Sequence, residues 1–380
     1  MQQGILLLLF MLPSALFRSL KGVLFGLLAL LWINQMIAER RTIVKRPPFD
    51  LPLILFALWI PVALIGALDR IYSAGEYAKF LLEVFTFYLI ATFVQTEKQM
   101  NRVISSLMIL TAVVSGYGVA KFFLWESGSL LNRSVRATSL TPEFHWLSLY
   151  FVLVIPFLLC YTMAEECGRR KIGYALFALS LFCLFLTYTR SAWIAVWVEC
   201  FLYIALKKRR WLIPFLVMGV LSVALFFYLP KVGFQMDTTD PQTFQIRANA
   251  WDKVIHDVSL YQPFGVGFGR KPLFKIYPNG DIGDPRENVP HPHNLYLEML
   301  LTVGWPGLLL LLWFFWKIMR CLWLKVRSPH SAQTTLSLSL LMMMTGYLVY
   351  NLFDHTMVGG MAHLFWFLVA LVPSESGKPG

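Results

Sequence analysis

Residues 145–163 read HWLSLYFVLVIPFLLCYTM and contain no Asp, Glu, Lys or Arg. A helix crosses the hydrocarbon core of a bilayer with about 20 mainly apolar residues, so this stretch predicts a membrane-spanning helix. Similar stretches recur along the chain of 380 residues, which is 57% hydrophobic and 14% charged. Soluble domains carry about 25% charged residues, so the composition excludes an ordinary soluble enzyme. We therefore predict an all-α polytopic membrane protein.

Outward from that stretch, the apolar runs predict about twelve membrane-spanning helices. They are expected near residues 4–17, 23–38, 51–68, 78–94, 103–124, 145–163, 172–188, 191–206, 211–229, 295–318, 335–353 and 357–373. No Lys or Arg precedes the first run and no small-residue cleavage site follows it, so we do not interpret it as a removable signal peptide. Residues 1–380 are expected to form a single membrane domain, with residues 230–294 as one large loop between the ninth and tenth helices.

Basic residues in the short loops predict the orientation, because Lys and Arg accumulate on the cytoplasmic side. With residue 1 placed inside, the inner segments include the basic runs 169–171 and 207–210, and these segments together carry the whole net charge of +12. Both termini are then cytoplasmic, and the loop at 230–294 faces away from the cytoplasm. The basic residues are spread over several loops and do not form one patch, so no nucleic-acid partner is expected.

The large loop contains signals of its own. Asp240-Pro241 is typical of a helix start, because Asp accepts hydrogen bonds from free N–H groups and Pro suits the first helical position. Apolar residues then recur at helical spacing, which predicts an amphipathic helix near 241–258 at the membrane surface. A glycine-rich turn follows at 265–269. It lacks the preceding strand and following helix of a dinucleotide-binding motif.

Three basic residues lie on the outer side in this topology: Arg190, Arg247 and His293. Each has a structural interpretation, since Arg190 can extend to the interface, Arg247 can be solvated and His293 can cap the next helix. Their expected convergence on one membrane face favours a site. Two guanidinium groups suit the oxygens of a diphosphate, and a histidine beside them can take a proton near neutral pH. The combination suits group transfer from a pyrophosphate-linked donor to a hydroxyl acceptor.

Other polar residues extend this candidate site. Arg133 and Arg136 lie in the outer loop 125–144 and suit an anionic substrate, and His291 suits a supporting role beside His293. Glu298 can orient a histidine or the acceptor. The short outer turn with Asp354 and His355 is a weaker candidate. The five cysteines are odd in number and show no metal-ligand spacing, so neither a disulfide framework nor a zinc site is expected. No cofactor is expected either.

Four motifs follow one another along the chain. They are Thr189-Arg190-Ser191-Ala192-Trp193, Arg247 with Trp251, Pro263-Phe264-Gly265-Val266-Gly267-Phe268-Gly269, and His293-Asn294-Leu295-Tyr296-Leu297-Glu298 with Gly304 and Gly307. Together they resemble the O-antigen ligase family, which also contains O-antigen polymerases and bacterial protein O-oligosaccharyltransferases. Thr189 departs from the family's frequent Ser, and the short C-terminal end disfavours the oligosaccharyltransferase branch.

The resemblance implies a GT-C-like glycosyltransferase in the inner membrane of a Gram-negative bacterium, with its active site facing the periplasm. It implies a glycan donor on undecaprenyl pyrophosphate and an acceptor hydroxyl on the lipid A–core oligosaccharide. In this interpretation Arg190 and Arg247 bind the pyrophosphate and His293 is the general base of a metal-independent, inverting transfer. The expected substrate-binding residues are Arg133, Arg136, His291, Asn294, Glu298 and Trp251.

Alternatives remain open at this stage. A polymerase would use the same lipid-linked donor, so the motifs separate it poorly from a ligase. A transporter for an anionic lipid or solute also uses buried Arg and His, but the sequence shows no internal repeat. A metal-dependent glycosyltransferase would need acidic ligands on an early outer loop. Asp69 and Glu76 lie there, but Arg70 is adjacent and no paired-carboxylate motif is present.

Overall fold

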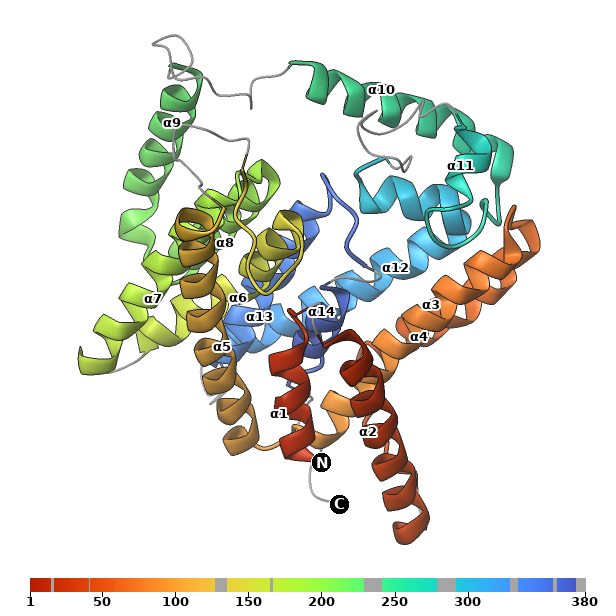
Figure 1. The fold of residues 1–380 in the computed structure, drawn as a ribbon, viewed down its shortest axis with the longest axis horizontal. Coiled ribbons are helices and arrows are strands. Elements are labelled where there is room, and N and C mark those ends of the chain that lie inside the picture. Colours follow the sequence, from red (N-terminus) through yellow and green to blue (C-terminus); the bar gives the residue numbers. More distant parts are fainter. Residues whose placement is uncertain are drawn as a thin grey trace. The chain divides into compact units, whose positions relative to one another are not determined.

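The computed structural model describes residues 1–14, 17–40, 42–126, 135–164, 167–228, 241–278, 292–328, 334–357 and 361–373. Throughout these ranges the chain is helical with short connections, and the ranges contain no β-strand (Figure 1). The prediction of an all-α protein is therefore confirmed.

Apart from α10 and α11, which lie in the predicted large loop, the helices coincide with the apolar runs of the sequence, because a backbone in an apolar environment must satisfy its own N–H and C=O groups. They are α1 (Gln2–Met11), α2 (Arg18–Glu39), α3 (Asp50–Ala63), α4 (Arg70–Phe93), α5 (Glu97–Leu124), α6 (Phe144–Ala164), α7 (Cys167–Leu186), α8 (Arg190–Lys207), α9 (Leu212–Tyr228), α10 (Pro241–Asp257), α11 (Leu273–Ile276), α12 (Leu295–Arg327), α13 (Thr334–Tyr350) and α14 (Ala362–Val369), with 3-10 turns at Leu64–Gly66, Arg209–Trp211 and Val258–Tyr261. Each predicted span therefore overlaps a helix.

Four helices within the described residues are long and apolar enough to cross a membrane: Ser19–Glu39, Glu97–Leu124, Phe144–Ala164 and Leu295–Arg327. Shorter apolar helices occur at Gln2–Met11, Asp50–Gly66 and Thr334–Tyr350. These helices indicate a membrane-embedded protein, whereas the number of twelve spans stays a prediction.

The chain divides into two compact units. The first comprises Met1–Arg40, Thr96–Thr239 and Ser328–Tyr350, and the second comprises Arg41–Gln95, Asp240–Arg327 and Asn351–Gly380. The expectation of a single membrane domain with a large loop between α9 and α12 stays a prediction.

The central helix of the first unit is α6, which packs against α7, α8 and α13. Every residue from Leu147 to Cys160 is buried, as expected for a helix that is apolar on all sides. Its buried polar residue Tyr150 is paired, since the hydroxyl groups of Tyr150 and Thr111 lie 2.8 Å apart. Such bonds satisfy polar groups that an apolar interior cannot solvate.

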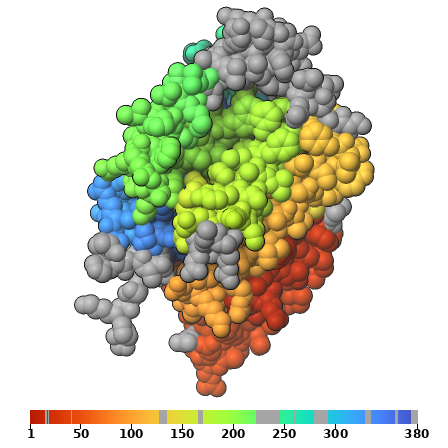
Figure 2. Space-filling view, turned by 90° about the vertical axis from the view of Figure 1, so that its left-hand side faces the viewer, coloured from red at the N-terminus to blue at the C-terminus, as the bar shows by residue number. Residues whose placement is uncertain are grey.

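The outer helix α9 packs against α8 in the same unit. Its side chains Ile213, Val217 and Val220 are exposed, and Figure 2 shows α9 in green on the surface of this unit. An extended apolar helix surface of this kind is typical of contact with lipid.

In the second unit α12 lies alongside α3, and α14 packs against α4 (Figure 1). The indole of Trp366 occupies the aromatic core of this unit. Its ring centroid lies 5.8 Å from that of Phe80, 6.1 Å from that of Phe87 and 5.6 Å from that of Phe314. Offset and edge-to-face aromatic contacts at these separations add to the stabilisation from burial. This core supports the start of α12, where the candidate site lies.

Helix α12 is broken at Gly304, whose backbone has φ 73° and ψ 180°. The sequence predicted a continuous helix at 295–318, so the break is a correction. A helix end leaves four carbonyls without intrahelical partners, and here each has a donor. Leu300 O accepts from Gln262 Nε2 at 3.3 Å, Leu301 O from Val266 N at 3.0 Å, Thr302 O from Gly267 N at 3.1 Å and Val303 O from Trp59 Nε1 at 2.8 Å. The glycine-rich turn at 265–269 therefore caps this helix end together with Gln262 and Trp59.

Gly265 shows why this turn is rich in glycine. Its φ is +76°, and a Cβ there would lie 2.6 Å from the carbonyl oxygen of Thr302. Only glycine adopts such a conformation at this close approach without strain. On its other side the turn bonds the α3–α4 connection, since Leu68 N donates to Val266 O at 2.9 Å.

Asp69 caps α4 in this connection, because its carboxylate accepts from Tyr72 N at 3.1 Å. This backbone hydrogen bond, together with the nearby charges of Lys271 and Lys275, lowers the pKa of Asp69. Lys271 Nζ lies 3.7 Å from its carboxylate. The structure thus gives Asp69 a role in the fold, next to the glycine-rich turn.

Candidate functional site

The amphipathic helix predicted in the large loop is present as α10 and begins at Pro241. Arg247 and Trp251 lie four residues apart, so their side chains share one face of this helix. Arg247 is half-buried. It forms no hydrogen bond or ion pair with any residue that the structure describes. A guanidinium group that no carboxylate neutralises is available to an anionic ligand.

The indole of Trp251 connects α10 with the segment that precedes α12. Its Nε1–H donates to the carbonyl oxygen of Pro292 at 2.7 Å, and its ring centroid lies 6.4 Å from that of Phe353. Pro292 directly precedes His293, so Trp251 holds the backbone next to the candidate base. The helix that carries Arg247 is thereby tied to the residue before His293.

Replacing Trp251 with Phe is expected to keep the aromatic contact and to remove the bond to Pro292. A neutral hydrogen bond contributes about 0.5–1.5 kcal/mol to stability. We therefore expect Trp251→Phe to lower the thermal unfolding midpoint in detergent, while the exposed Trp211→Phe serves as the control. An unfolding midpoint equal to that of the wild type would show that the bond to Pro292 contributes nothing.

His293 is buried and has a left-handed backbone with φ 47°. This conformation is uncommon for a residue with a side chain and concentrates at functional sites. The helix cap is supplied by its neighbour, because Asn294 Oδ1 accepts from Tyr296 N at 3.0 Å and from Leu297 N at 3.1 Å. Asn294 therefore supplies this cap, which the sequence had also allowed for His293.

The segment after His293 is bonded to the turn at 351–356. Asn294 Nδ2 donates to Leu352 O at 3.1 Å, and Leu295 N donates to Asn351 O at 3.0 Å. The turn is itself fixed, since Asn351 Oδ1 accepts hydrogen bonds from the backbone N–H and from the hydroxyl group of Thr356, both at 3.0 Å. The Asn294 amide thus has structural partners on both sides, and its predicted contact with substrate stays a prediction.

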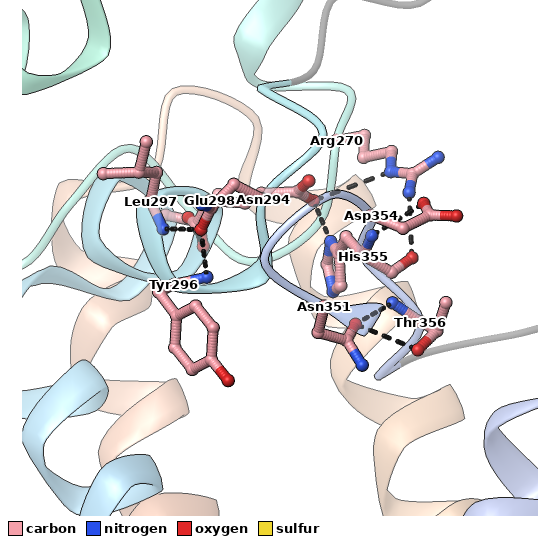
Figure 3. Close-up of polar contacts among 10 residues, drawn as sticks. Arg270, Asn294, Tyr296, Leu297, Glu298, Asn351, Asp354, His355 and Thr356 are labelled. Atoms are coloured by element: carbon pink, nitrogen blue, oxygen red, sulfur yellow. Dashed lines mark hydrogen bonds and ion pairs between the residues drawn. The ribbon is translucent and has the colours of Figure 1, made fainter. Parts of the chain in front are cut away.

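An ionic cluster lies where these segments meet (Figure 3). The carboxylate of Glu298 is fully buried, contacts Nδ1 of His355 and lies 3.6 Å from Nε of Arg270. Nη2 of Arg270 also donates to the carbonyl oxygen of His355 at 3.1 Å. Asp354 Oδ1 accepts from the backbone N–H of His355 at 2.7 Å. The cluster therefore orders Glu298 and the imidazole of His355 together.

Sequence reasoning missed Arg270 in this cluster. Arg270 directly follows the glycine-rich turn, which is a signal for a backbone with a defined direction. Its partners Glu298 and His355 lie far along the chain, so no local pattern indicates the contact. His355 was a weaker candidate from its position in an outer turn, and the structure gives it a buried carboxylate partner.

Arg190 lies in the first unit as the first residue of α8, and its side chain is exposed. The free N–H groups at a helix N-terminus favour an anion and disfavour a cation there. An arginine at this position adds to a local positive potential that suits phosphate oxygens.

Arg136 lies on a segment that is hydrogen-bonded to the end of α7. That helix end lies only a few residues before Arg190 in the sequence. Ala137 N donates to Leu186 O at 2.9 Å, and the Ser139 hydroxyl donates to Val114 O at 2.7 Å. The guanidinium of Arg136 stacks 4.4 Å from the ring centroid of Phe144. The structure thus brings the loop of Arg136 onto the turn that leads into Arg190.

The predicted site residues divide between the two units. Arg136 and Arg190 belong to the first unit, and Arg247, Trp251, His293, Asn294 and Glu298 belong to the second. Arg133 and His291 lie outside the described residues. The convergence of Arg190 with Arg247 and His293 stays a prediction.

Comparison with protein families gives a match over residues 175–312 to the family model described as O-antigen ligase. The matched region contains Arg190, Arg247 and His293, together with the break at Gly304. A comparison with curated proteins gives no match. The match and the sequence motifs point to the same family independently of the geometry above.

Proposed function

We propose, from the O-antigen ligase family assignment that residues 175–312 support, that this membrane-embedded protein is a glycosyltransferase that ligates O-antigen. It transfers polysaccharide from undecaprenyl pyrophosphate to a hydroxyl of the lipid A–core oligosaccharide. In the proposal the chain has a GT-C-like architecture of twelve spans in the inner membrane, with both termini in the cytoplasm and the site facing the periplasm. Arg133, Arg136 and His291 extend the surface for these substrates.

One observation carries the proposal within the matched region. Arg247 has no hydrogen bond or ion pair among the described residues, and Trp251 on the same helix face binds the carbonyl directly before His293. The helix that carries a cation available for phosphate is therefore hydrogen-bonded, through Trp251, to the segment of a histidine in a left-handed conformation. Anion binding and proton transfer are the two functions that this reaction requires.

Arg190 and Arg247 bind the pyrophosphate in the proposed mechanism. Planar guanidinium groups donate two parallel hydrogen bonds to phosphate oxygens. Negative charge grows on the pyrophosphate as its bond to the anomeric carbon breaks, so these hydrogen bonds strengthen in the transition state. The two arginines supply the positive charge for departure, and the transfer is metal-independent.

His293 acts as the general base. Its imidazole takes the proton of the acceptor hydroxyl while the hydroxyl oxygen forms a bond to the anomeric carbon. The bond from that carbon to the pyrophosphate oxygen breaks on the opposite face, and its electron pair leaves with the pyrophosphate. Attack and departure on opposite faces invert the anomeric configuration.

Replacing Arg247 with Ala tests the donor site. Removing one donor of hydrogen bonds to a developing negative charge costs about 10²–10³-fold in kcat, so we expect kcat/KM for the lipid-linked donor to fall by about that factor. Arg247→Lys keeps the charge but loses the two-pronged geometry, and an intermediate loss is expected. The assay follows transfer by the purified protein in detergent.

The matched control is Lys253→Ala, which removes a cation from the same helix. Lys253 Nζ lies 5.3 Å from the ring centroid of Tyr277 and has no part in the proposed chemistry. Wild-type transfer is expected in this control. Wild-type kcat/KM in Arg247→Ala would contradict pyrophosphate binding by Arg247.

A further inference from the structure

The cluster of Arg270, Glu298 and His355 is not used by the transfer step proposed above (Figure 3). Its members come from three segments: Arg270 follows the glycine-rich turn, Glu298 lies in the first turns of α12, and His355 lies in the turn at 351–356. The exposed fraction of the side chain is 36% for Arg270, 0% for Glu298 and 6% for His355. The carboxylate is therefore fully buried, whereas the imidazole is slightly exposed and the arginine more so.

Stability alone does not account for this cluster. Removing a carboxylate from water costs several kcal/mol. A protein in which apolar residues of similar volume replace a buried ion pair is often equally stable. The N-terminus of α12 already has its cap in Asn294. Glu298 is therefore not needed to complete the helix end, and a role in orienting His355 explains its burial better.

The contact between His355 and Glu298 favours one of the two neutral forms of the imidazole ring. Nδ1 of His355 lies against Oε1 of Glu298. A lone pair on Nδ1 would face the lone pairs of the carboxylate oxygen, so this contact favours the tautomer with its proton on Nδ1. In the neutral ring Nε2 then presents a lone pair and acts as a hydrogen-bond acceptor.

Nε2 of His355 is the atom that points to a ligand. Both ring nitrogens are buried and have no hydrogen-bond partner among the described residues. Nδ1 has the carboxylate of Glu298 as its ion-pair partner, whereas Nε2 has no ion-pair partner there. Buried polar atoms in proteins are nearly always hydrogen-bonded, and exceptions mark sites where a ligand, a water or a reacting group completes the bonding. The imidazole is thus held from one side by a carboxylate and is able to accept a hydrogen bond on the other.

We propose that Nε2 of His355 binds a hydroxyl group of the glycan substrate, while Glu298 orients the ring and Arg270 balances the charge of Glu298. This inference rests on the proposed function, since the glycan is the substrate that carries hydroxyls. A lone pair on Nε2 accepts an O–H group but repels phosphate oxygens. The subsite therefore selects sugar hydroxyls and is chemically distinct from the arginines that bind pyrophosphate.

The position of His355 gives this subsite a purpose in catalysis. Its turn is hydrogen-bonded to the segment after His293 through Asn294 and Leu295. A sugar held by His355 is therefore held relative to the backbone that carries the proposed base. A sugar fixed in this way loses translational and rotational entropy when it binds, so this loss no longer adds to the barrier of the transfer step.

The test measures binding of two water-soluble glycans to the purified full-length protein in detergent. One is the polysaccharide released by mild acid from the lipid-linked donor, and the other is the core oligosaccharide released from lipopolysaccharide. Loss of one hydrogen bond to a neutral group corresponds to about 10-fold in Kd at the upper end. We expect His355→Phe to raise the Kd of one of the two glycans about 10-fold and to leave the other unchanged.

The glycan whose Kd rises in His355→Phe identifies the hydroxyl as one of the donor polysaccharide or one of the acceptor core oligosaccharide. The control is His145→Phe, because His145 also contacts a carboxylate, Glu143 at 2.6 Å, but with 39% of its side chain exposed. His355→Gln retains a polar group and is expected to lose about threefold in affinity. It replaces the Phe variant if that variant does not give a monodisperse protein.

Equal Kd values in wild type and His355→Phe for both glycans would overturn the subsite, as would undetectable binding of both by the wild type. Transfer by the wild type is measured in parallel. Absence of transfer overturns the proposed function, whereas transfer with unaltered glycan binding in His355→Phe overturns the hydroxyl subsite alone.

Discussion

The variant His293→Asn is expected to lose about 10²–10⁴-fold in kcat of glycan transfer, because general-base catalysis contributes a factor of that size. Asparagine adopts the left-handed conformation more readily than most residues, so it preserves the backbone with φ 47° at this position. The substitution therefore removes the imidazole without disturbing the segment between Pro292 and Asn294. Initial rates at saturating donor and acceptor give kcat directly.

The control for this variant is His256→Ala, since His256 is an exposed histidine on α10. We expect His256→Ala to keep wild-type kcat. An unfolding midpoint of His293→Asn close to that of the wild type shows that the loss is chemical. Transfer by His293→Asn at the wild-type rate would contradict the role of His293 as the base.

The variant Gly304→Ala is expected to destabilise the protein by about 3–5 kcal/mol. A left-handed conformation costs an alanine about 1–2 kcal/mol, and a Cβ at this residue would lie 1.7 Å from the carbonyl oxygen of Pro263. Relief of that overlap must move the 262–267 segment, which disrupts hydrogen bonds worth about 0.5–1.5 kcal/mol each. Among these is the bond from Trp305 N to Gln262 Oε1 at 2.9 Å.

Thermal unfolding in detergent measures this effect as a lower midpoint or as loss of the monodisperse protein. The control is Gly75→Ala in the same unit, because a Cβ at Gly75 would meet nothing within 4 Å. A helical glycine in open space tolerates alanine and gains from its lower backbone entropy. Equal midpoints for Gly304→Ala and Gly75→Ala would contradict the capped-break description of α12.

The helices were predictable from the sequence because their causes are local. An uncharged run such as 145–163 must form internal hydrogen bonds in an apolar environment, and α6 follows it closely. The start of α10 at Pro241 was also predictable, since Asp240 and Pro241 determine a helix start by their own chemistry.

The break in α12 was not predictable because its causes are tertiary. The carbonyl oxygens of residues 300–303 accept hydrogen bonds from Trp59, Gln262, Val266 and Gly267. These partners lie far from α12 along the chain, and the apolar sequence alone suits a continuous helix. The same reason hides Arg270, whose contacts with Glu298 and His355 exist only in the folded unit.

The candidate site was predictable in its residue types and partly in its geometry. The one-turn spacing of Arg247 and Trp251 follows from helical periodicity. The bond from Trp251 to Pro292 does not, because it joins two segments that no local pattern relates. The capping of α12 by Asn294 in place of His293 depends on a single backbone conformation at His293.

The most direct measurement of the central claim is the product formed by the purified wild-type protein in detergent with a chelator present. The reaction contains undecaprenyl-pyrophosphate-linked polysaccharide and lipopolysaccharide that lacks O-antigen. The predicted result is polysaccharide attached to the lipid A–core, formed without added metal. Glycans that lengthen on the undecaprenyl carrier while the core stays unmodified would contradict the ligase and identify a polymerase.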